Sequence, residues 1–148
     1  MDGRKVIFLA DDDIDDREFF QDALSEVSTD SELIIAEDGV LLMEALKSMV
    51  PPPPHLIFLD LNMPRKNGYE CLSDIRNSDK YKDIPVVIFS TTDNPDVIAK
   101  TQSLGANLYL RKPTSFDLLK RMINHVLSLD LSRVGITSSK EGFYIKVF

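Results

Sequence analysis

Side chains that could do chemistry follow four short apolar runs of the sequence. The runs and the residues after them are 6–10 before Asp11 and Asp12, 56–59 before Asp60, 86–89 before Ser90, and 108–110 before Arg111 and Lys112. Carboxylates from two of these places would repel one another if they met, unless a hard cation lay among them. Mg²⁺ fits this description, because it takes oxygen ligands and needs only one or two carboxylates and a backbone carbonyl.

The side chains of Ser90 and Lys112 would complete a different kind of site. An ammonium, a hydroxyl donor and a cation together surround a place suited to a dianionic phosphoryl group. A carboxylate in that place can act as the nucleophile and form an acyl phosphate. Asp60 stands alone after its apolar run, so we expect it to be the acceptor.

The segments between these runs have helical spacing. Continuous apolar runs of four or five residues are typical of strands buried on both faces of a parallel sheet. A weaker run at 33–36 gives a fifth strand. The expected helices are 16–27, 40–49, 68–77, a segment from Pro95 to about Gly105, and one capped by Thr114 or Ser115. The sequence therefore predicts an α/β fold, a doubly wound five-stranded parallel sheet, whose strand ends bring the polar residues to one edge.

Composition narrows the function classes. The chain has 148 residues, a formal charge of −7 and 43% hydrophobic residues, which suits one folded domain. Six acids between Asp11 and Glu18 would repel nucleic acid. No apolar run approaches the roughly 18 residues that span a bilayer, and Cys71 has no partner for a disulfide. We therefore expect a cytoplasmic protein that binds neither nucleic acid nor membrane.

Residues 5–128 resemble the receiver domain of response regulators in two-component signalling. The resemblance rests on the acidic pair Asp11 and Asp12, on Leu-Asp-Leu-Asn-Met-Pro around Asp60, on Ser90, and on Lys112 followed by Pro113. Each motif alone is weak, but their order and their positions at strand ends make the set specific. The resemblance implies a flavodoxin-like receiver fold, and a signalling switch rather than an enzyme.

The resemblance also implies a role for each residue. Asp60 would accept a phosphoryl group from a phosphohistidine on a sensor histidine kinase or a histidine phosphotransfer protein. Mg²⁺ would be bound by Asp12, Asp60 and the backbone carbonyl of Asn62, with Asp11 acting mainly through water. Lys112 would contact the phosphoryl oxygens. Ser90 and Tyr109 would be the switch residues, and helix 95–105, strand 108–111 and the last helix would form the face read by an unidentified downstream protein.

Several alternatives remain open at this stage. Asp13 extends the acidic pair to a triplet, so the pair could be shifted by one position. Tyr109 is as consistent with a core residue as with a switch. An aspartyl-phosphate phosphatase of the haloacid-dehalogenase type would need an acid where Asn62 stands, and a P-loop enzyme would need a glycine-rich lysine loop. The stronger rival is a binding module on the same fold that works without phosphorylation.

The ends of the helices and of the chain give further predictions. Asp15 or Asp16 is expected to cap the first helix, and Pro51 to Pro54 to form a stiff spacer. Residues 1–129 are predicted to form the receiver domain and 130–148 an extension, too short for an output domain. Alternating apolar residues after Gly142 predict a strand that pairs with this sheet or across a homodimer. The subgroup resembled is that of stand-alone regulators paired with phytochrome-type kinases.

Overall fold

The protein forms a three-layer α/β sandwich in a computed structural model that describes residues 5–48, 54–129, 131 and 144–145. The strands are β1 (Lys5–Ala10), β2 (Ser31–Ala36), β3 (Leu56–Leu59), β4 (Val86–Ser90), β5 (Leu108–Arg111) and β6 (Tyr144–Ile145). The helices are α1 (Ile14–Val27), α2 (Gly39–Ser48), α3 (Gly68–Arg76), α4 (Pro95–Ser103) and α5 (Phe116–Ser128). The alternation predicted from the sequence is confirmed.

The strands lie in the order β2-β1-β3-β4-β5-β6, and every pair is parallel. The five predicted strands are all present, and a short sixth strand extends the sheet beyond them. β6 pairs Tyr144 with Tyr109 and Ile145 with Leu110 along the outer edge of β5. The other residues of the predicted C-terminal strand, like Pro51 to Pro53 of the predicted spacer, lie outside the described residues.

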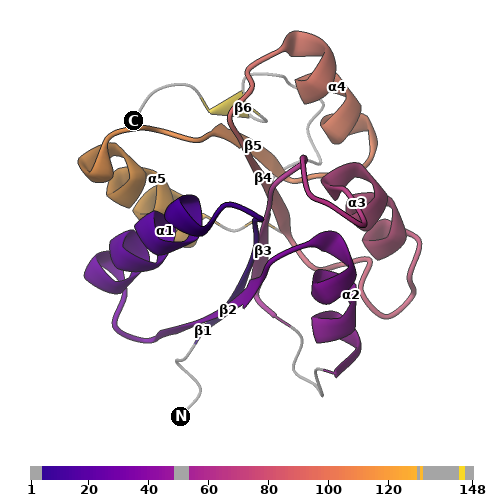
Figure 1. Ribbon diagram of the computed structural model, residues 1–148, viewed down its shortest axis with the longest axis horizontal. Coiled ribbons are helices and arrows are strands. Elements are labelled where there is room, and N and C mark those ends of the chain that lie inside the picture. The colour runs from indigo at the N-terminus through magenta and orange to yellow at the C-terminus, as the bar shows by residue number, and fades with distance from the viewer. Residues whose placement is uncertain (1–4, 49–53, 130, 132–143, 146–148) are drawn as a thin grey trace.

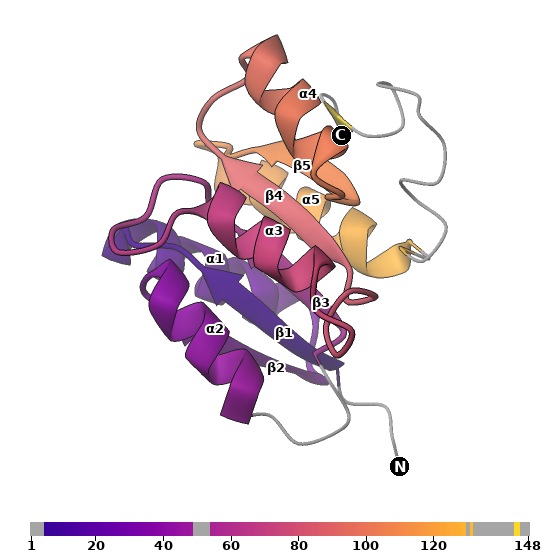
Figure 2. The same ribbon diagram turned by 90° about the vertical axis from the view of Figure 1, so that its right-hand side faces the viewer.

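The sheet separates two apolar cores. Helices α1 and α5 cover one face, and α2, α3 and α4 cover the other (Figure 1; Figure 2 shows the second face). On the α1–α5 side, the rings of Phe20, Phe58 and Phe89 meet edge to face, with centroids 4.8 to 6.1 Å apart. On the other side, Phe8, Ile57 and residues of α2 and α3 pack together. This two-sided burial explains why the strands read as continuous apolar runs.

Helix α1 begins two residues earlier than the sequence pattern predicted, and its N-cap is Asp13. The Asp13 side chain accepts a hydrogen bond from the backbone N–H of Asp16 at 3.1 Å. The prediction of Asp15 or Asp16 as the cap is therefore wrong. An N-cap needs an extended backbone one position before the helix, and Asp13 has it, whereas Asp15 and Asp16 lie in the first turn. The side chain of Asp16 is left available for another contact.

The other helix ends follow the sequence signals. Asn67 and Glu70 form a capping box on α3, Asn94 caps α4 before Pro95, and Ser115 caps α5. Gly105 follows α4 with φ of 103°, a backbone conformation that glycine adopts without strain. Among the described residues, no helix has the length and apolar character needed to cross a membrane.

Candidate functional site

The predicted site residues meet at the carboxyl edge of the sheet. Asp11 follows β1, Asp60 follows β3, Ser90 ends β4 and Lys112 follows β5. Backbone hydrogen bonds continue past the strand ends and fix these positions. The N–H of Asp60 donates to Ala10 at 2.9 Å, and the N–H of Lys112 donates to Ser90 at 2.7 Å. The backbone hydrogen bonds between the strands therefore fix the position of each functional residue.

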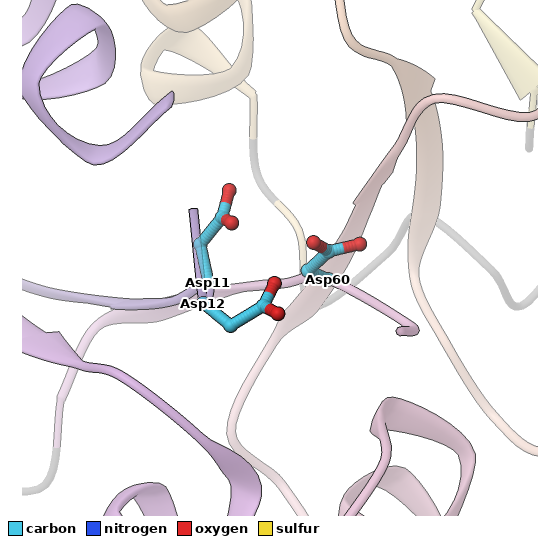
Figure 3. A group of neighbouring side chains, drawn as sticks. All are labelled: Asp11, Asp12 and Asp60. Carbon is cyan, nitrogen blue, oxygen red and sulfur yellow. The ribbon is translucent and has the colours of Figure 1, made fainter. Parts of the chain in front are cut away.

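Three carboxylates gather at this edge. Asp11, Asp12 and Asp60 each offer one oxygen within 4.8 Å of the others, and Figure 3 shows the three side chains grouped around one space. Asp12 is exposed, whereas Asp11 is fully buried and Asp60 nearly so. Asp13 does not belong to the group, because its side chain caps α1. The cluster is therefore formed by the first two acids of the triplet, together with Asp60.

Asp11 is the fully buried member of this cluster. Its Oδ1 accepts a hydrogen bond from the N–H of Asp13 at 3.0 Å, and its buried Oδ2 faces Lys112. The ammonium of Lys112 lies 2.8 Å from that oxygen as an ion-pair partner. Burial raises the pKa of Asp11 to about 6, against the lowering effect of Lys112 and the Asp13 amide. Asp11 is therefore a buried carboxylate whose main stabilising partner is the Lys112 ammonium.

Lys112 neutralises the acids from the opposite side. Its Nζ lies 2.8 Å from Asp11, 3.1 Å from Asp60 and 2.9 Å from Asp16, with only 8% of the side chain exposed. Burial by itself would lower the pKa of Lys112, but the Asp11 and Asp60 carboxylates outweigh it and hold the pKa above its ordinary value. The lysine is therefore charged, and it links both halves of the site.

Ser90 and Tyr109 lie on the same side of the site, one strand apart. The Ser90 hydroxyl is buried and accepts a long hydrogen bond, 3.4 Å, from the N–H of Thr92. The Tyr109 ring is fully buried in the core under α2 to α4, and its hydroxyl donates to the Thr92 carbonyl at 2.8 Å. Both residues thus contact the same short segment after β4, which couples the core aromatic to the edge.

The loop after Asp60 is held in place by its neighbours. The N–H of Leu61 donates to Asp60 Oδ1 at 2.8 Å and orients the carboxylate. Asn62 follows, with its side chain exposed. Arg65, at φ of 66°, is the centre of a tight turn that the N–H of Lys66 closes onto Pro64 at 2.7 Å.

A fork between Arg65 and Asp38 fastens this turn to the start of α2. Arg65 Nε and Nη2 donate to the two oxygens of Asp38 at 2.8 and 3.3 Å. Asp38 also accepts from the N–H of Leu41 at 2.8 Å, and its bond to Arg65 holds its pKa below the usual range. An arginine fork is rigid and planar, so it fixes both the distance and the direction of the loop.

Gly68 allows the loop to close against the strand end. Its N–H donates to the Leu61 carbonyl at 2.9 Å. A Cβ at this position would lie 2.2 Å from the Asp60 carbonyl oxygen and 2.8 Å from the Leu61 Cα, and both are backbone atoms that cannot turn away. The glycine is therefore required by close approach rather than by its own backbone angles.

We expect Gly68→Ala to destabilise the fold by about 3 kcal/mol, because the loop must shift to admit the methyl group. Urea denaturation measures this loss, and the amide resonance of Leu61 should move with it. Ser73→Ala, a methyl-sized change at a half-buried position of the same helix, should stay within about 0.5 kcal/mol of the parent. If Gly68→Ala were as stable as Ser73→Ala, the loop after Asp60 would be able to move enough to accept the methyl group without loss of stability.

Sequence reasoning missed two parts of this site. Asp16 is one of the two residues predicted to cap the first helix, yet its carboxylate lies against Lys112, 96 residues further along the chain. Nothing in the local pattern signals a contact of that range. The Asp38–Arg65 fork was also missed, although an acid just before a helix start and an arginine in the loop after Asp60 are visible in the sequence.

The donor set fits a divalent cation. Three carboxylates converge, and all the ligand atoms are hard oxygens. An ammonium and a hydroxyl lie beyond the carboxylates, at neighbouring strand ends. The fold and the site together define a class: a doubly wound parallel domain whose strand-end acids suit a divalent cation beside an anionic group.

Comparison with known proteins gives the family. Residues 7–124 match the family described as response regulator receiver domain, so the chain belongs to that family. The response regulator Rcp1 of Synechocystis sp. is 35% identical over 139 residues, which cover 91% of this chain and 95% of Rcp1. The prediction of a receiver domain is thereby confirmed.

Solved structures agree. The phosphorylated cyanobacterial phytochrome response regulator RcpA superposes with a TM-score of 0.76 at 33% identity, covering 83% of this chain and 91% of RcpA. The Mn²⁺-bound form of Rcp1 gives a TM-score of 0.75 at 36% identity, covering 88% and 96%. The predicted fold and the likeness to regulators of phytochrome signalling are confirmed.

The general function follows from membership of the response regulator receiver family. Receiver domains of response regulators are switches that accept phosphoryl groups from sensor histidine kinases and signal rather than catalyse metabolic reactions. The acidic cluster of this chain and the Mn²⁺-bound relative support divalent metal binding. The particular residues, donor and partner of this chain belong to the proposal below.

Proposed function

We propose that this protein is a phosphorylation switch in which Asp60 is the acceptor. A carboxylate oxygen of Asp60 attacks the phosphorus of a phosphohistidine, presented by a sensor histidine kinase or a histidine phosphotransfer protein. The new bond is an O–P bond, and the P–N bond breaks with its electron pair returning to the imidazole nitrogen. The observation that carries the proposal is the placement of Asp60 between two acids and the Lys112 ammonium, 3.1 Å away.

Mg²⁺ would be held by Asp11, Asp12, Asp60 and the backbone carbonyl of Asn62, the first three of which converge. When bound, it would neutralise the negative charge that builds up on the acids and the transferred group. The buried Asp11 carboxylate, paired with Lys112 at 2.8 Å, would add a further negative charge next to the ion. Leu61 holds Asp60 Oδ1 through its N–H, so the carboxylate presents Oδ2 on the side of Lys112.

Lys112 and Ser90 would receive the phosphoryl oxygens. Lys112 is held beside Asp60 at 3.1 Å, so its positive charge lies close to where the phosphoryl oxygens would be. The Ser90 hydroxyl has only a long hydrogen bond to release before it turns towards the phosphoryl group. Thr92, which Ser90 and Tyr109 both contact, would carry this movement to the Tyr109 side chain.

We propose that the changed face of α4, β5 and α5 is then read by a protein partner. β6 runs along the edge of β5 in this region, which is consistent with residues 130–148 forming an extension that packs on the receiver domain of residues 1–129. The same edge would serve a homodimer if the extension exchanged between copies. The kinase and the site of action would be cytoplasmic, where phosphohistidine donors are available.

Intact mass spectrometry tests the acceptor directly. We expect the wild type to gain one phosphoryl group from phosphoramidate, whose P–N bond imitates phosphohistidine, only when Mg²⁺ is present. Asp60→Asn should gain none, because an amide cannot be the nucleophile. Asp74→Asn, at a half-exposed acid of α3 paired with Lys66, should gain one like the parent. A wild type that takes up no phosphoryl group from this donor or from a purified kinase would favour the phosphorylation-independent binding module.

A further inference from the structure

Lys112 has a third acidic partner that does not belong to the metal cluster. Asp16 Oδ2 accepts a hydrogen bond from Lys112 Nζ at 2.9 Å. The other two partners, Asp11 and Asp60, are also members of the carboxylate group that suits a cation, whereas Asp16 is not. The Lys112 ammonium therefore has three carboxylate partners. A metal ion would bind two of them, Asp11 and Asp60, but not Asp16.

A cation at the cluster and the ammonium of Lys112 compete for the same oxygens. Lys112 Nζ lies 2.8 Å from Asp11 Oδ2 and 3.1 Å from Asp60 Oδ2, and Asp11 is fully buried. A dication bound by these carboxylates removes the charge that attracts the lysine and repels the ammonium in addition. Because the Lys112 side chain is only 8% exposed, water cannot fully replace a lost acceptor.

Asp16 can supply that acceptor. It lies in the first turn of α1, where its backbone N–H is held by the Asp13 side chain, so its position is set independently of the metal site. Its side chain is 38% exposed, so it keeps more of its hydration than Asp11, whose side chain is 1% exposed. Asp13 performs the capping, and the Asp16 carboxylate is free of that role.

We propose that Asp16 is a positioning residue for Lys112, holding the ammonium when a divalent cation takes Asp11 and Asp60. The inference rests on the proposed metal site and adds a residue to it. When Mg²⁺ binds, Lys112 loses part of its interaction with Asp11 and Asp60, and its contact with Asp16 reduces the free-energy cost of that loss. Asp16 therefore strengthens Mg²⁺ binding without contacting the ion. It also keeps Lys112 beside Asp60, within reach of an incoming phosphoryl group.

Comparison of Asp16→Asn with Asp15→Asn separates this role from simple charge. Asp15 is an exposed acid in the same helical turn, so both substitutions remove one negative charge near the cluster. MgCl₂ is titrated at constant ionic strength, and the amide resonances of residues 11–13 and 60–62 are followed. We expect Asp16→Asn to weaken Mg²⁺ binding about five- to tenfold more than Asp15→Asn, the size expected for one charge-assisted hydrogen bond. Asp16→Glu should recover part of the affinity.

A double-mutant cycle with Lys112→Met identifies the partner. In the Lys112→Met background, Asp16→Asn should affect Mg²⁺ binding no more than Asp15→Asn does, because there is no ammonium left to hold. A full effect in that background would mean that Asp16 acts on the metal itself, and the inference would be wrong. Equal effects of Asp16→Asn and Asp15→Asn in the parent would also overturn it.

The proposed function and this inference fail in different ways. If the wild type shows no saturable Mg²⁺ shifts at Asp11, Asp12 and Asp60, the proposed metal site is wrong and the inference falls with it. If the wild type binds Mg²⁺ there but Asp16→Asn behaves like Asp15→Asn, the metal site stands and only the role of Asp16 is lost. Circular dichroism of each variant confirms that the comparison is made on folded protein.

Discussion

Lys112→Met is expected to lower the free energy of unfolding by about 3–5 kcal/mol at neutral pH in the absence of divalent cations, as for other broken buried ion pairs. The methionine fills much the same volume, so packing changes little. The loss arises because the ammonium contacts Asp11, Asp16 and Asp60, and Asp11 is fully buried. Without Lys112, the buried Asp11 carboxylate loses its ion-pair partner.

Two treatments should restore stability to this variant, because both reduce the negative charge that Asp11 and Asp60 carry once Lys112 is removed. Mg²⁺ should stabilise Lys112→Met more than the wild type, because it meets no competing ammonium and binds the folded state alone. Lower pH should also help. The pKa of Asp11 is already raised by burial to about 6 in the wild type, and Lys112 lowers it, so removing Lys112 raises it further.

The sign of the pH effect follows from that direction. An acid whose pKa is higher in the folded than in the unfolded state takes up its proton on folding. Its contribution to stability is complete below the unfolded pKa and is lost as the pH rises through the folded value. Lys112→Met should therefore gain stability, relative to the wild type, as the pH falls from about 8 to about 6.

Urea denaturation with EDTA, with Mg²⁺ and across this pH range measures all three effects. Lys120→Met is the control, since Lys120 pairs with Glu26 and Asp117 on the surface between α1 and α5 and its loss should cost less than about 1 kcal/mol. If Lys112→Met in EDTA were as stable as Lys120→Met, the three acids would be sufficiently hydrated without the lysine.

The fold could be predicted because its signals are local. A strand buried on both faces needs an apolar run, and the runs at 6–10, 56–59 and 86–89 have no other ready explanation. Parallel strands bring their carboxyl ends to one edge, so Asp60 and Lys112 could be placed together although 52 residues separate them. The same logic placed Ser90, which ends its strand.

The parts that were missed depend on side chains reaching across the fold. Asp16 and Asp15 are equivalent as residues of a first helical turn, and only the position of α1 against the β5 end determines which one meets Lys112. The choice of Asp13 as the cap depends on where β1 ends and how the chain turns after it. The hydrogen bonds between Arg65 and Asp38 require the loop after Asp60 to fold back onto the start of α2. The hydrophobic periodicity of the sequence does not predict that contact.

Arg76 is the clearest example of a residue that sequence patterns leave unassigned. It ends α3 and could be read as one more residue of the helix face. Its guanidinium donates to the carbonyls of Gly105, Lys82 and Ile84 and to Asn107 Oδ1, at 2.8 to 3.0 Å. These contacts lie at the amino edge of the sheet, opposite the acidic site.

The network around Arg76 joins three segments of chain. Asn107 Oδ1 also accepts from the N–H of Val86 at 2.8 Å, and its Nδ2 donates to the Leu131 carbonyl at 3.0 Å. The end of α3, the start of β4 and the connection into β5 are therefore fixed by one guanidinium and one amide. Burial lowers the pKa of Arg76, but an arginine guanidinium stays charged in proteins.

Arg76→Ala is therefore expected to destabilise the protein by about 3–5 kcal/mol, because three carbonyls and an amide oxygen lose a charged donor together. Arg76→Lys should recover little of this, since one ammonium cannot reach acceptors that the planar fork spans. Arg111→Ala, which removes a surface pair with Asp93 between half-exposed side chains, should cost less than about 1 kcal/mol.

Hydrogen exchange distinguishes a local from a global effect of Arg76→Ala. If the network holds the amino ends of β4 and β5, amides of residues 84–86 and 105–108 should exchange fastest in the variant, ahead of the β1–β3 core. The acidic edge lies at the other end of the same strands, so phosphoryl uptake by Asp60 in the folded fraction should remain. Uniform acceleration of exchange would indicate that Arg76 supports the whole sheet rather than these two connections.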